Sequence, residues 1–327
     1  MAANVESMFY VGKMPWHEEG KKLDTPPDSI TAIQQAGLNW EVSKTRLYTE
    51  GGILVGDYYG IVRNGQKKQT ILGVVKAGYT PLQNRDAFTF FDPLIKSDFL
   101  EYETAGAIGQ GEIIWILAKI KKDSRFTVCA DDEISKYLLL SNSHDGLSAV
   151  SVKFTPIRVV CQNTLNLALE KGDTTRIKHL SSIHVRLDYL SVAVEDILRV
   201  YRGAEENFKA MYDHKMSDDE TWGYFDALYP VLEEKYVLTE SQYKVREKNI
   251  NTQNLLMNIY DSEINRMLGI RGRLWAAYNA ATQYIDHPFN YRFDDNHLLK
   301  RIWFGDGESQ KAKAYAAAMK FIDRIVA

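Results

Sequence analysis

The hydrophobic period of this chain changes near residue 182, and that change limits the folds available to it. Residues 38–160 carry short segments in which β-branched and aromatic side chains alternate with polar ones, the period of a half-buried strand. After residue 182 apolar residues recur at intervals of three and four, as in a helix packed along its length. We therefore predict an α+β fold: an antiparallel-rich sheet with packed helices over 1–182, and a helical, bundle-like region over 183–327 packed on it.

Turn residues divide the first region into strands. We predict strands at 38–48, 53–62 and 69–75, and the last two flank an Asn64-Gly65 pair, a strong hairpin signal. Strands at 137–141 and 148–154 flank a second predicted turn at 142–146. The glycine-rich segment 106–111 leads into an alternating segment at 112–121. A dinucleotide-binding loop would open a helix, so we interpret these glycines as a tight turn between strands.

Start and stop residues locate the helices. In the first region we predict helices from Ser29 to Gly37, from a capping Asn84 to Lys96, and over 162–170. In the second region we predict helices at 239–268, where Thr239 begins a capping box, at 273–286 and at 309–326. Residues 217–220 form the predicted connector. The longest apolar series favours the core of a helical bundle over a coiled coil between subunits, and it comprises Leu187, Leu190, Val194, Ile197, Tyr201, Ala204, Phe208 and Met211.

Composition excludes several classes of protein. Forty basic and forty-three acidic residues give a net charge of -3, which argues against a nucleic-acid clamp of high bulk charge. Two cysteines, Cys129 and Cys161, are too few for a disulfide scaffold or a multi-cysteine zinc site. The chain lacks an apolar run of membrane length, and its start lacks the pattern of a signal peptide. We expect a cytoplasmic protein without membrane contact.

Catalytic and metal-binding patterns are sparse. The seven histidines do not form a metal-ligand spacing, so we expect no metal and no cofactor. Cys161, His144 and Asn163 could supply a thiol nucleophile, its base and an orienting amide. Cys161, however, follows the apolar run 157–160, and such a position favours a buried and inert thiol. We favour a protein that is not an enzyme.

Basic residues near an aromatic ring suggest a different function. Trp115, Lys119 and Lys121 share one face of the predicted strand 112–121, and Lys153 and Arg158 lie on a later strand. A ring for stacking beside cations for phosphates is what a single-strand nucleic-acid groove uses. The alternative is a solvated sheet edge guarded by lysines.

The position of Arg158 allows two interpretations. It precedes a predicted helix start at 162–164, where it could hold a phosphate or carboxylate jointly with the free helix amides. Alternatively, Arg158 forms an internal ion pair with an acidic residue such as Asp145.

Six stretches of the sequence resemble one family. They are PWHEEG at 15–20, GVVKAGYTPLQN at 73–84, YETAGAIGQG at 102–111, NSHDG at 142–146, TPIRVVCQNTL at 155–165 and LWAAYNAATQYIDH at 274–287. This order of motifs is similar to that of the "phage/plasmid-like protein" family of unknown function. The resemblance implies a phage or mobile-element origin and the cytoplasm of a bacterial host, but it implies no reaction. The family-motif residues are His144, Asp145, Arg158, Cys161 and Asn163.

These observations lead to two function hypotheses of different classes. The first is a homo-oligomeric protein that binds and anneals single-stranded nucleic acid during recombination without ATP, since the chain has no phosphate-loop lysine motif. Its predicted contacts are Trp115, Lys119, Lys121, Lys153 and Arg158. The alternative is a phage protein that inhibits a host defence protein by binding to it.

Overall fold

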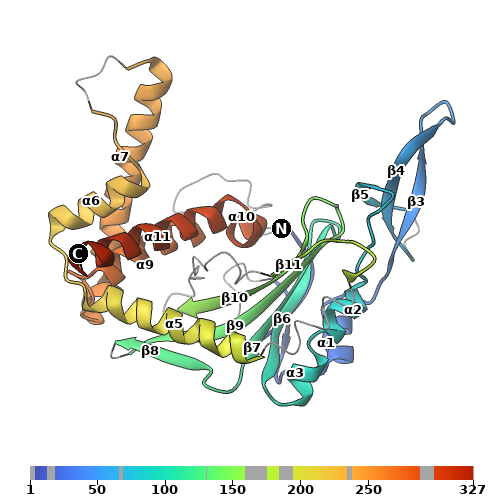
Figure 1. The fold of residues 1–327 in the computed structure, drawn as a ribbon, viewed down its shortest axis with the longest axis horizontal. Coiled ribbons are helices and arrows are strands. Elements are labelled where there is room, and N and C mark those ends of the chain that lie inside the picture. Colours follow the sequence, from blue (N-terminus) through green and yellow to red (C-terminus); the bar gives the residue numbers. More distant parts are fainter. Residues whose placement is uncertain are drawn as a thin grey trace.

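The structure is a computed structural model of the 327-residue chain. It describes residues 4–12, 19–65, 69–129, 131–158, 175–183, 194–233, 238–287 and 298–326. The α+β prediction is confirmed, because strands in antiparallel sheets fill the N-terminal half and helices the C-terminal half (Figure 1). The predicted helix at 162–170 and two positions of the apolar series, Leu187 and Leu190, lie outside the described residues.

The larger sheet has the strand order β11-β10-β9-β7-β6-β1-β2, and β8 pairs with the first residues of β9. Neighbouring strands are antiparallel, apart from the parallel pair β1–β2. The strands are β1 (Val5–Val11), β2 (Lys21–Leu23), β6 (Leu100–Ile108), β7 (Ile113–Ile120), β8 (Arg125–Cys129), β9 (Asp132–Ser143), β10 (Val150–Arg158) and β11 (Thr175–Ile177).

Most of the strand predictions for this sheet are confirmed. β7, β9 and β10 cover most of the predicted segments, but β9 continues to Ser143, so the connection to β10 begins within the predicted turn at 142–146. Gly109 and Gly111 have φ values of 74° and 102° in the turn from β6 to β7, which confirms a tight turn in place of a phosphate loop. The prediction that strands begin near residue 38 is wrong, because β1 pairs with β6 and brings residues 5–11 into the sheet.

The smaller sheet contains β3 (Val42–Tyr48), β4 (Leu54–Arg63) and β5 (Ile71–Lys76) in antiparallel order. Gly65 has a φ of 83° in the turn after β4, as expected for the Asn64-Gly65 pair. This sheet projects from the rest of the molecule (Figure 1). We call residues 41–76 the blade.

Three short helices follow the N-terminal strands and the blade. α1 (Ser29–Gln35) begins where the Asp28 carboxylate accepts a hydrogen bond from the Thr31 amide at 2.7 Å. The predicted second helix is divided into α2 (Asn84–Thr89) and α3 (Asp92–Lys96). The prediction that Asn84 caps it is wrong: its side chain donates to the Leu38 carbonyl at 3.1 Å and ties α2 to the segment before the blade.

The C-terminal half is helical, as predicted. The capping box at Thr239 is confirmed, but the helix that it begins ends at Tyr260 and a short helix follows. Residues 217–220 are not a connector, because Ser217 and Glu220 form a capping box that starts a helix. The helices are α5 (Val194–Asp213), α6 (Asp218–Leu228), α7 (Glu240–Tyr260), α8 (Glu263–Met267), α9 (Leu274–Asp286), α10 (Leu298–Phe304) and α11 (Asp306–Val326).

Four side chains of the apolar series, Tyr201, Ala204, Phe208 and Met211, are buried within the chain. Phe208 is fully buried, and the centre of its ring lies 5.0 Å from that of Trp275 and 6.2 Å from that of Tyr315. It also stacks on Phe126 of β8 at 6.1 Å. The intramolecular core interpretation is therefore confirmed over these residues, and one buried cluster includes both strands and C-terminal helices.

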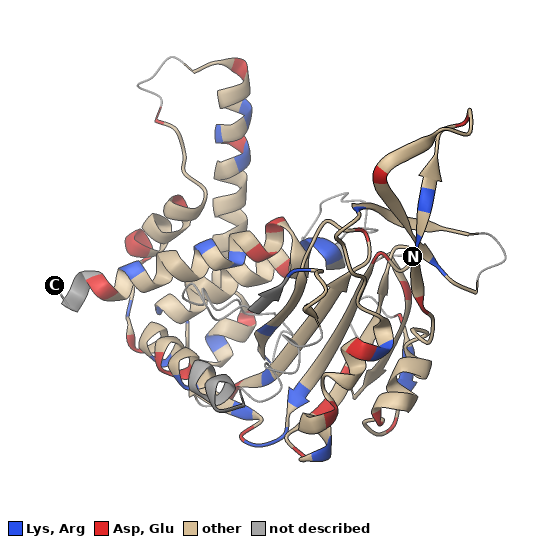
Figure 2. Ribbon diagram, turned by 45° about the vertical axis from the view of Figure 1, so that its right-hand side comes forward, with Lys and Arg blue, Asp and Glu red and all other residues tan. Residues whose placement is uncertain are grey.

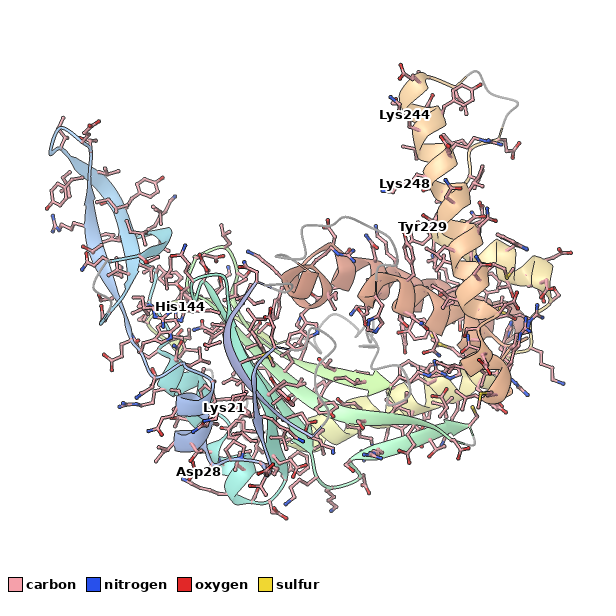
Figure 3. The ribbon with its side chains drawn as sticks, turned by 180° about the vertical axis from the view of Figure 1, so that it is seen from behind. Lys21, Asp28, His144, Tyr229, Lys244 and Lys248 are labelled. Atoms are coloured by element: carbon pink, nitrogen blue, oxygen red, sulfur yellow. The ribbon has the colours of Figure 1, made fainter. Side chains whose placement is uncertain are left out.

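The helices cover the larger sheet from both sides. α5 and α9 pack on the face that carries Phe126 and Ile134, whereas the corner between α10 and α11 lies over the face that carries Trp115. The blade and the outer half of α7 remain as two projections at opposite ends of the molecule (Figures 1 and 3). Among the described residues, none of the helices is both long and apolar enough to cross a membrane.

Candidate functional site

Strand register brings together part of the predicted nucleic-acid groove. β7 pairs with β9 through Leu117 and Leu139, and β9 pairs with β10 through Leu139 and Lys153. Residues opposite one another in adjacent strands share a face, and so do residues two apart. Trp115, Lys119 and Lys153 therefore lie on the same face of the sheet. The alternative of a guarded edge is wrong, since β7 lies between β6 and β9.

Trp115 is not available for stacking. Its exposed fraction is 1%, and the Trp303 ring meets it edge-on with ring centres 5.9 Å apart. The expectation of an exposed ring is wrong, because the corner between α10 and α11 covers this part of the sheet. That corner comes from a segment nearly 190 residues further along the chain.

The three lysines of the predicted groove also have internal partners. Lys153 Nζ donates to the Trp303 carbonyl at 2.9 Å and to Glu308 Oε1 at 2.5 Å. Lys119 lies 4.0 Å from a Glu101 carboxylate oxygen, and Lys121 donates to Asp98. Each of these lysines is paired with a carboxylate, so the three do not form the continuous row of cations that a phosphate backbone favours.

Arg158 lies on the opposite face from this group. Ile157 pairs with Ser135 and packs with the Trp115 cluster, so the next residue points to the other side of β10. Its guanidinium donates to both oxygens of Asp132 at 2.7 Å, and Trp275 Nε1 donates to the same carboxylate at 2.7 Å. The ion-pair interpretation is confirmed, with Asp132 as the partner and not Asp145.

The family-motif residue His144 lies where the blade joins the body (Figure 3), and the backbone of its neighbour Asp145 lies against Gly73 of β5. His144 is fully buried, and its Nε2 lies 2.9 Å from Asn84 Oδ1. The Asn84 amide nitrogen donates to the carbonyls of Leu38 and Trp40, so Asn84 Oδ1 is the acceptor and His144 Nε2 carries the proton. Cys161 and Asn163 lie outside the described residues.

His144 is a neutral group held in place by this junction. Burial and, to a lesser extent, the nearby His179 lower its pKa from 6.5 to about 3. His179 stacks on the Tyr79 ring at 4.5 Å, and the Tyr79 hydroxyl donates to the Ser143 carbonyl at 2.8 Å. Within the described ranges, no group of three or more His, Cys, Asp or Glu side chains could hold a metal ion. The described residues of the junction support the blade, whereas the proposed nucleophile Cys161 lies outside them.

Close backbone approach completes the junction. A Cβ atom on Gly73 of β5 would overlap the backbone of Asp145. Gly146 has a φ of 76°, and a Cβ atom there would meet Val75. The glycines of two family stretches therefore let β5 lie directly on the turn at 142–146.

The blade has one packed face and one open face. The inner face carries Val42, Ile61, Leu72 and Val75, which form a buried cluster with Trp40, Tyr59 and Tyr79. On the outer face, Tyr58 pairs with Lys76 and Gly60 with Val74, whereas Val62, which pairs with Ile71 on the same side, is buried. We define the outer face by Thr45, Leu47, Tyr58, Gly60, Ile71, Val74 and Lys76.

Large apolar side chains are exposed on the outer face. Tyr58, Ile71 and Val74 have exposed fractions of 45%, 51% and 55%. A Cβ atom on Gly60 would contact Leu47 at 3.1 Å and Ile71 at 3.5 Å, so the aliphatic side chains of β3 and β5 meet over this glycine. The result is a continuous apolar surface across three strands.

The tip of the blade adds to this surface. Tyr48, Ile53 and Leu54 have exposed fractions of 60%, 70% and 41%. The blade thus holds six of the fourteen large hydrophobic side chains that are exposed on the described part of the chain. The described residues of the blade include four basic and three acidic residues, a net charge of +1.

The fold and these contacts define an α+β protein with a projecting blade whose outer face is apolar. The family model "Domain of unknown function (DUF932)" matches residues 71–303, so the chain belongs to this family. The matched segment includes β5 and the junction, whereas β3 and β4 precede it. Neither the curated proteins nor the solved structures contain a match to the chain.

Proposed function

We propose that this chain is a binding protein that docks another protein on the outer face of its blade. The observation that carries the proposal is the concentration of exposed apolar side chains on one projecting sheet. A contiguous apolar patch on a soluble domain is characteristic of an interaction surface, and aromatic side chains such as Tyr58 are enriched at interface centres.

The junction at the base of the blade supports the same proposal. The inner face, the buried His144 network and the close approach of Gly73 hold β5 against the body. A sheet fixed in this way presents its outer face with little conformational entropy left to lose on binding. Inhibition of a host defence protein, the alternative function predicted from the sequence, would be one such protein-docking function. That alternative assumes the proposed phage or mobile-element origin.

A photo-crosslinking amino acid placed on the blade tests the proposal. We would place it at Val74 and, as a matched control, at Val245 on the outer half of α7, whose exposed fraction of 51% is close to that of Val74. In cells, position 74 is expected to give a discrete crosslinked species that position 245 does not give. Crosslinks of equal yield and identity from both positions, or none from position 74, would contradict the proposal.

Single-stranded nucleic acid is the second candidate partner. The observation that favours it is that the blade exposes two cations, Arg46 and Lys76, together with the rings of Tyr48 and Tyr58. On this proposal the binding surface is the blade, with Arg46 and Lys76 as exposed cations, instead of the covered sheet face. The predicted annealing and recombination function then acts through this projection.

Fluorescence anisotropy with labelled single strands separates the two candidates. Arg46→Glu with Lys76→Glu is expected to remove binding if nucleic acid contacts the blade, whereas Lys119→Glu with Lys121→Glu is expected to remove it if the strand contacts the larger sheet. Wild-type protein without affinity for single strands at low salt would exclude the nucleic-acid function altogether.

A further inference from the structure

We propose that the partner of the blade binds as an added strand: an extended peptide segment of that protein pairs with the outer edge of β3. This inference rests on the proposed function, because it states how the docked protein meets the blade and what its docking segment is made of. Strand addition needs an edge strand whose backbone groups are open, and a surface beside that edge for the side chains of the peptide.

The register of the blade determines which backbone groups of β3 face outward. The Asn64 amide donates to the Glu41 carbonyl at 2.9 Å, so these two residues form a hydrogen-bonded pair. Hydrogen-bonded and non-hydrogen-bonded pairs alternate along an antiparallel ladder, and Lys44 and Arg46 therefore belong to non-hydrogen-bonded pairs with β4. Their backbone amides and carbonyls point away from β4, and within the described ranges these groups have no hydrogen-bond partner.

A side-chain contact at the start of β3 supports this direction. Val42 lies two residues before Lys44, so its backbone groups also point away from β4. The Gln83 side-chain amide donates to the Val42 carbonyl and accepts from the Val42 amide, both at 3.0 Å, as a residue of a neighbouring strand would. The chain thus covers the first outward-facing residue of this edge and leaves the next two open.

Other sheet edges of the molecule are protected. Within the blade, β5 lies on the side of the body and β3 on the far side (Figure 1). A Cβ atom on Gly146 would lie 3.7 Å from the Val74 carbonyl oxygen, so the turn at 142–146 lies against the edge of β5. In the larger sheet the terminal strands β2 and β11 are three residues long, which limits pairing with another chain. β3 has seven residues and no proline, so it lacks these protections.

The side chains beside the edge define the chemistry of the peptide. Successive residues of an added strand alternate between faces, so every second one would lie beside Thr45 and Leu47 and extend the apolar outer face. Charged residues are sparse on the blade (Figure 2). On the opposite side, Lys44 Nζ donates to the Tyr79 carbonyl at 3.0 Å and turns away from the edge, whereas Arg46 is exposed. The edge therefore fits an extended peptide with alternating apolar residues and an acidic residue between them.

Selection from a library of random peptides, displayed to the full chain, tests the inference. The edge variant is Arg46→Pro, because proline removes the outward N–H and is tolerated on an edge strand at such a position. The matched control is Arg46→Ala, which loses the same side chain and keeps the N–H. The peptides selected on wild type are expected to bind Arg46→Ala at most about fivefold more weakly, as for one lost exposed ion pair. They are expected to bind Arg46→Pro at least about tenfold more weakly, because backbone hydrogen bonds are lost.

Hydrogen exchange of the wild-type chain adds a measurement that does not depend on the folding of a variant. Without peptide, the amides of Lys44 and Arg46 are expected to exchange faster than those of Ser43 and Thr45, which are bonded to β4. With the selected peptide, exchange at Lys44 and Arg46 is expected to slow by at least about tenfold.

Several outcomes overturn the inference. Peptides that bind Arg46→Pro as tightly as Arg46→Ala, or that leave exchange at Lys44 and Arg46 unchanged, show that the edge of β3 is not used. A wild-type dimer that Arg46→Pro dissociates would assign the edge to a second copy of the chain. If no peptide is selected while position 74 crosslinks to a protein, the inference fails and the proposed function stands. If position 74 gives no crosslink, both fail.

Discussion

At the scale of single residues, the buried polar groups serve to hold the fold together. Arg158 joins β10 to Asp132 at the start of β9 and, through Trp275, to α9. Its side chain is 1% exposed and that of Asp132 is fully buried, so each charge depends on the other. The strongest basic candidate for a ligand contact is thus a structural link between the sheet and the helices.

Arg158→Ala is expected to destabilise the protein by about 3–5 kcal/mol, because it leaves the Asp132 carboxylate buried without its counter-ion. Urea unfolding measures the loss. Lys121→Ala, which removes an exposed pair with Asp98, is the control and should leave the free energy of unfolding nearly unchanged. Equal stability of both variants would show that Arg158 is not held as described.

The acid sensitivity of the fold should depend on His144. Its pKa is about 3 in the folded chain against 6.5 when exposed, so the unfolded state binds one more proton between these values. Stability from this group is complete above pH 6.5 and is lost as the pH falls toward 3, by about 1.4 kcal/mol per pH unit. Unfolding curves of His144→Gln are expected to show a shallower fall over this range, and parallel curves for the two proteins would contradict the assignment.

At the scale of elements, the contact between β5 and the turn at 142–146 fixes the blade. Gly73→Ala is expected to cost about 1–3 kcal/mol, because the added methyl group would overlap the Asp145 backbone. Gly78→Ala is the matched control, since a Cβ atom there has nothing within 4 Å. Thermal melts compare the two, and a Gly73→Ala protein as stable as the control would show that the approach is not close.

Element-level prediction from the sequence succeeded where the signal was local. The period-two strands, the Asn64-Gly65 turn and the Thr239 capping box each depend on a few adjacent residues. The prediction for Asn84 was wrong because its side chain forms a long-range hydrogen bond to the Leu38 carbonyl instead of capping the helix. The predicted groove also failed because of long-range contacts. Strand register decides which face of the sheet Arg158 points to, and the distant residue Trp303 covers Trp115.

At the scale of the whole molecule, two projections extend from a body whose sheet is packed on both faces. The outer face of the blade could not be distinguished from the inner face by sequence, because alternating apolar residues look the same whether the body or a partner covers them. The structure separates them, since the inner side chains are buried against Trp40 and Tyr79 and the outer ones are not.

The central claim is that the outer face of the blade binds a protein partner. It is tested most directly by the dissociation constant of the complex with the protein captured at position 74, for wild type and for Tyr58→Ser with Val74→Ser. Since both side chains are exposed, the variant should melt as the wild type does and bind at least about tenfold more weakly, each lost apolar contact being worth about 1 kcal/mol or more. Equal affinity of the two proteins would contradict the account.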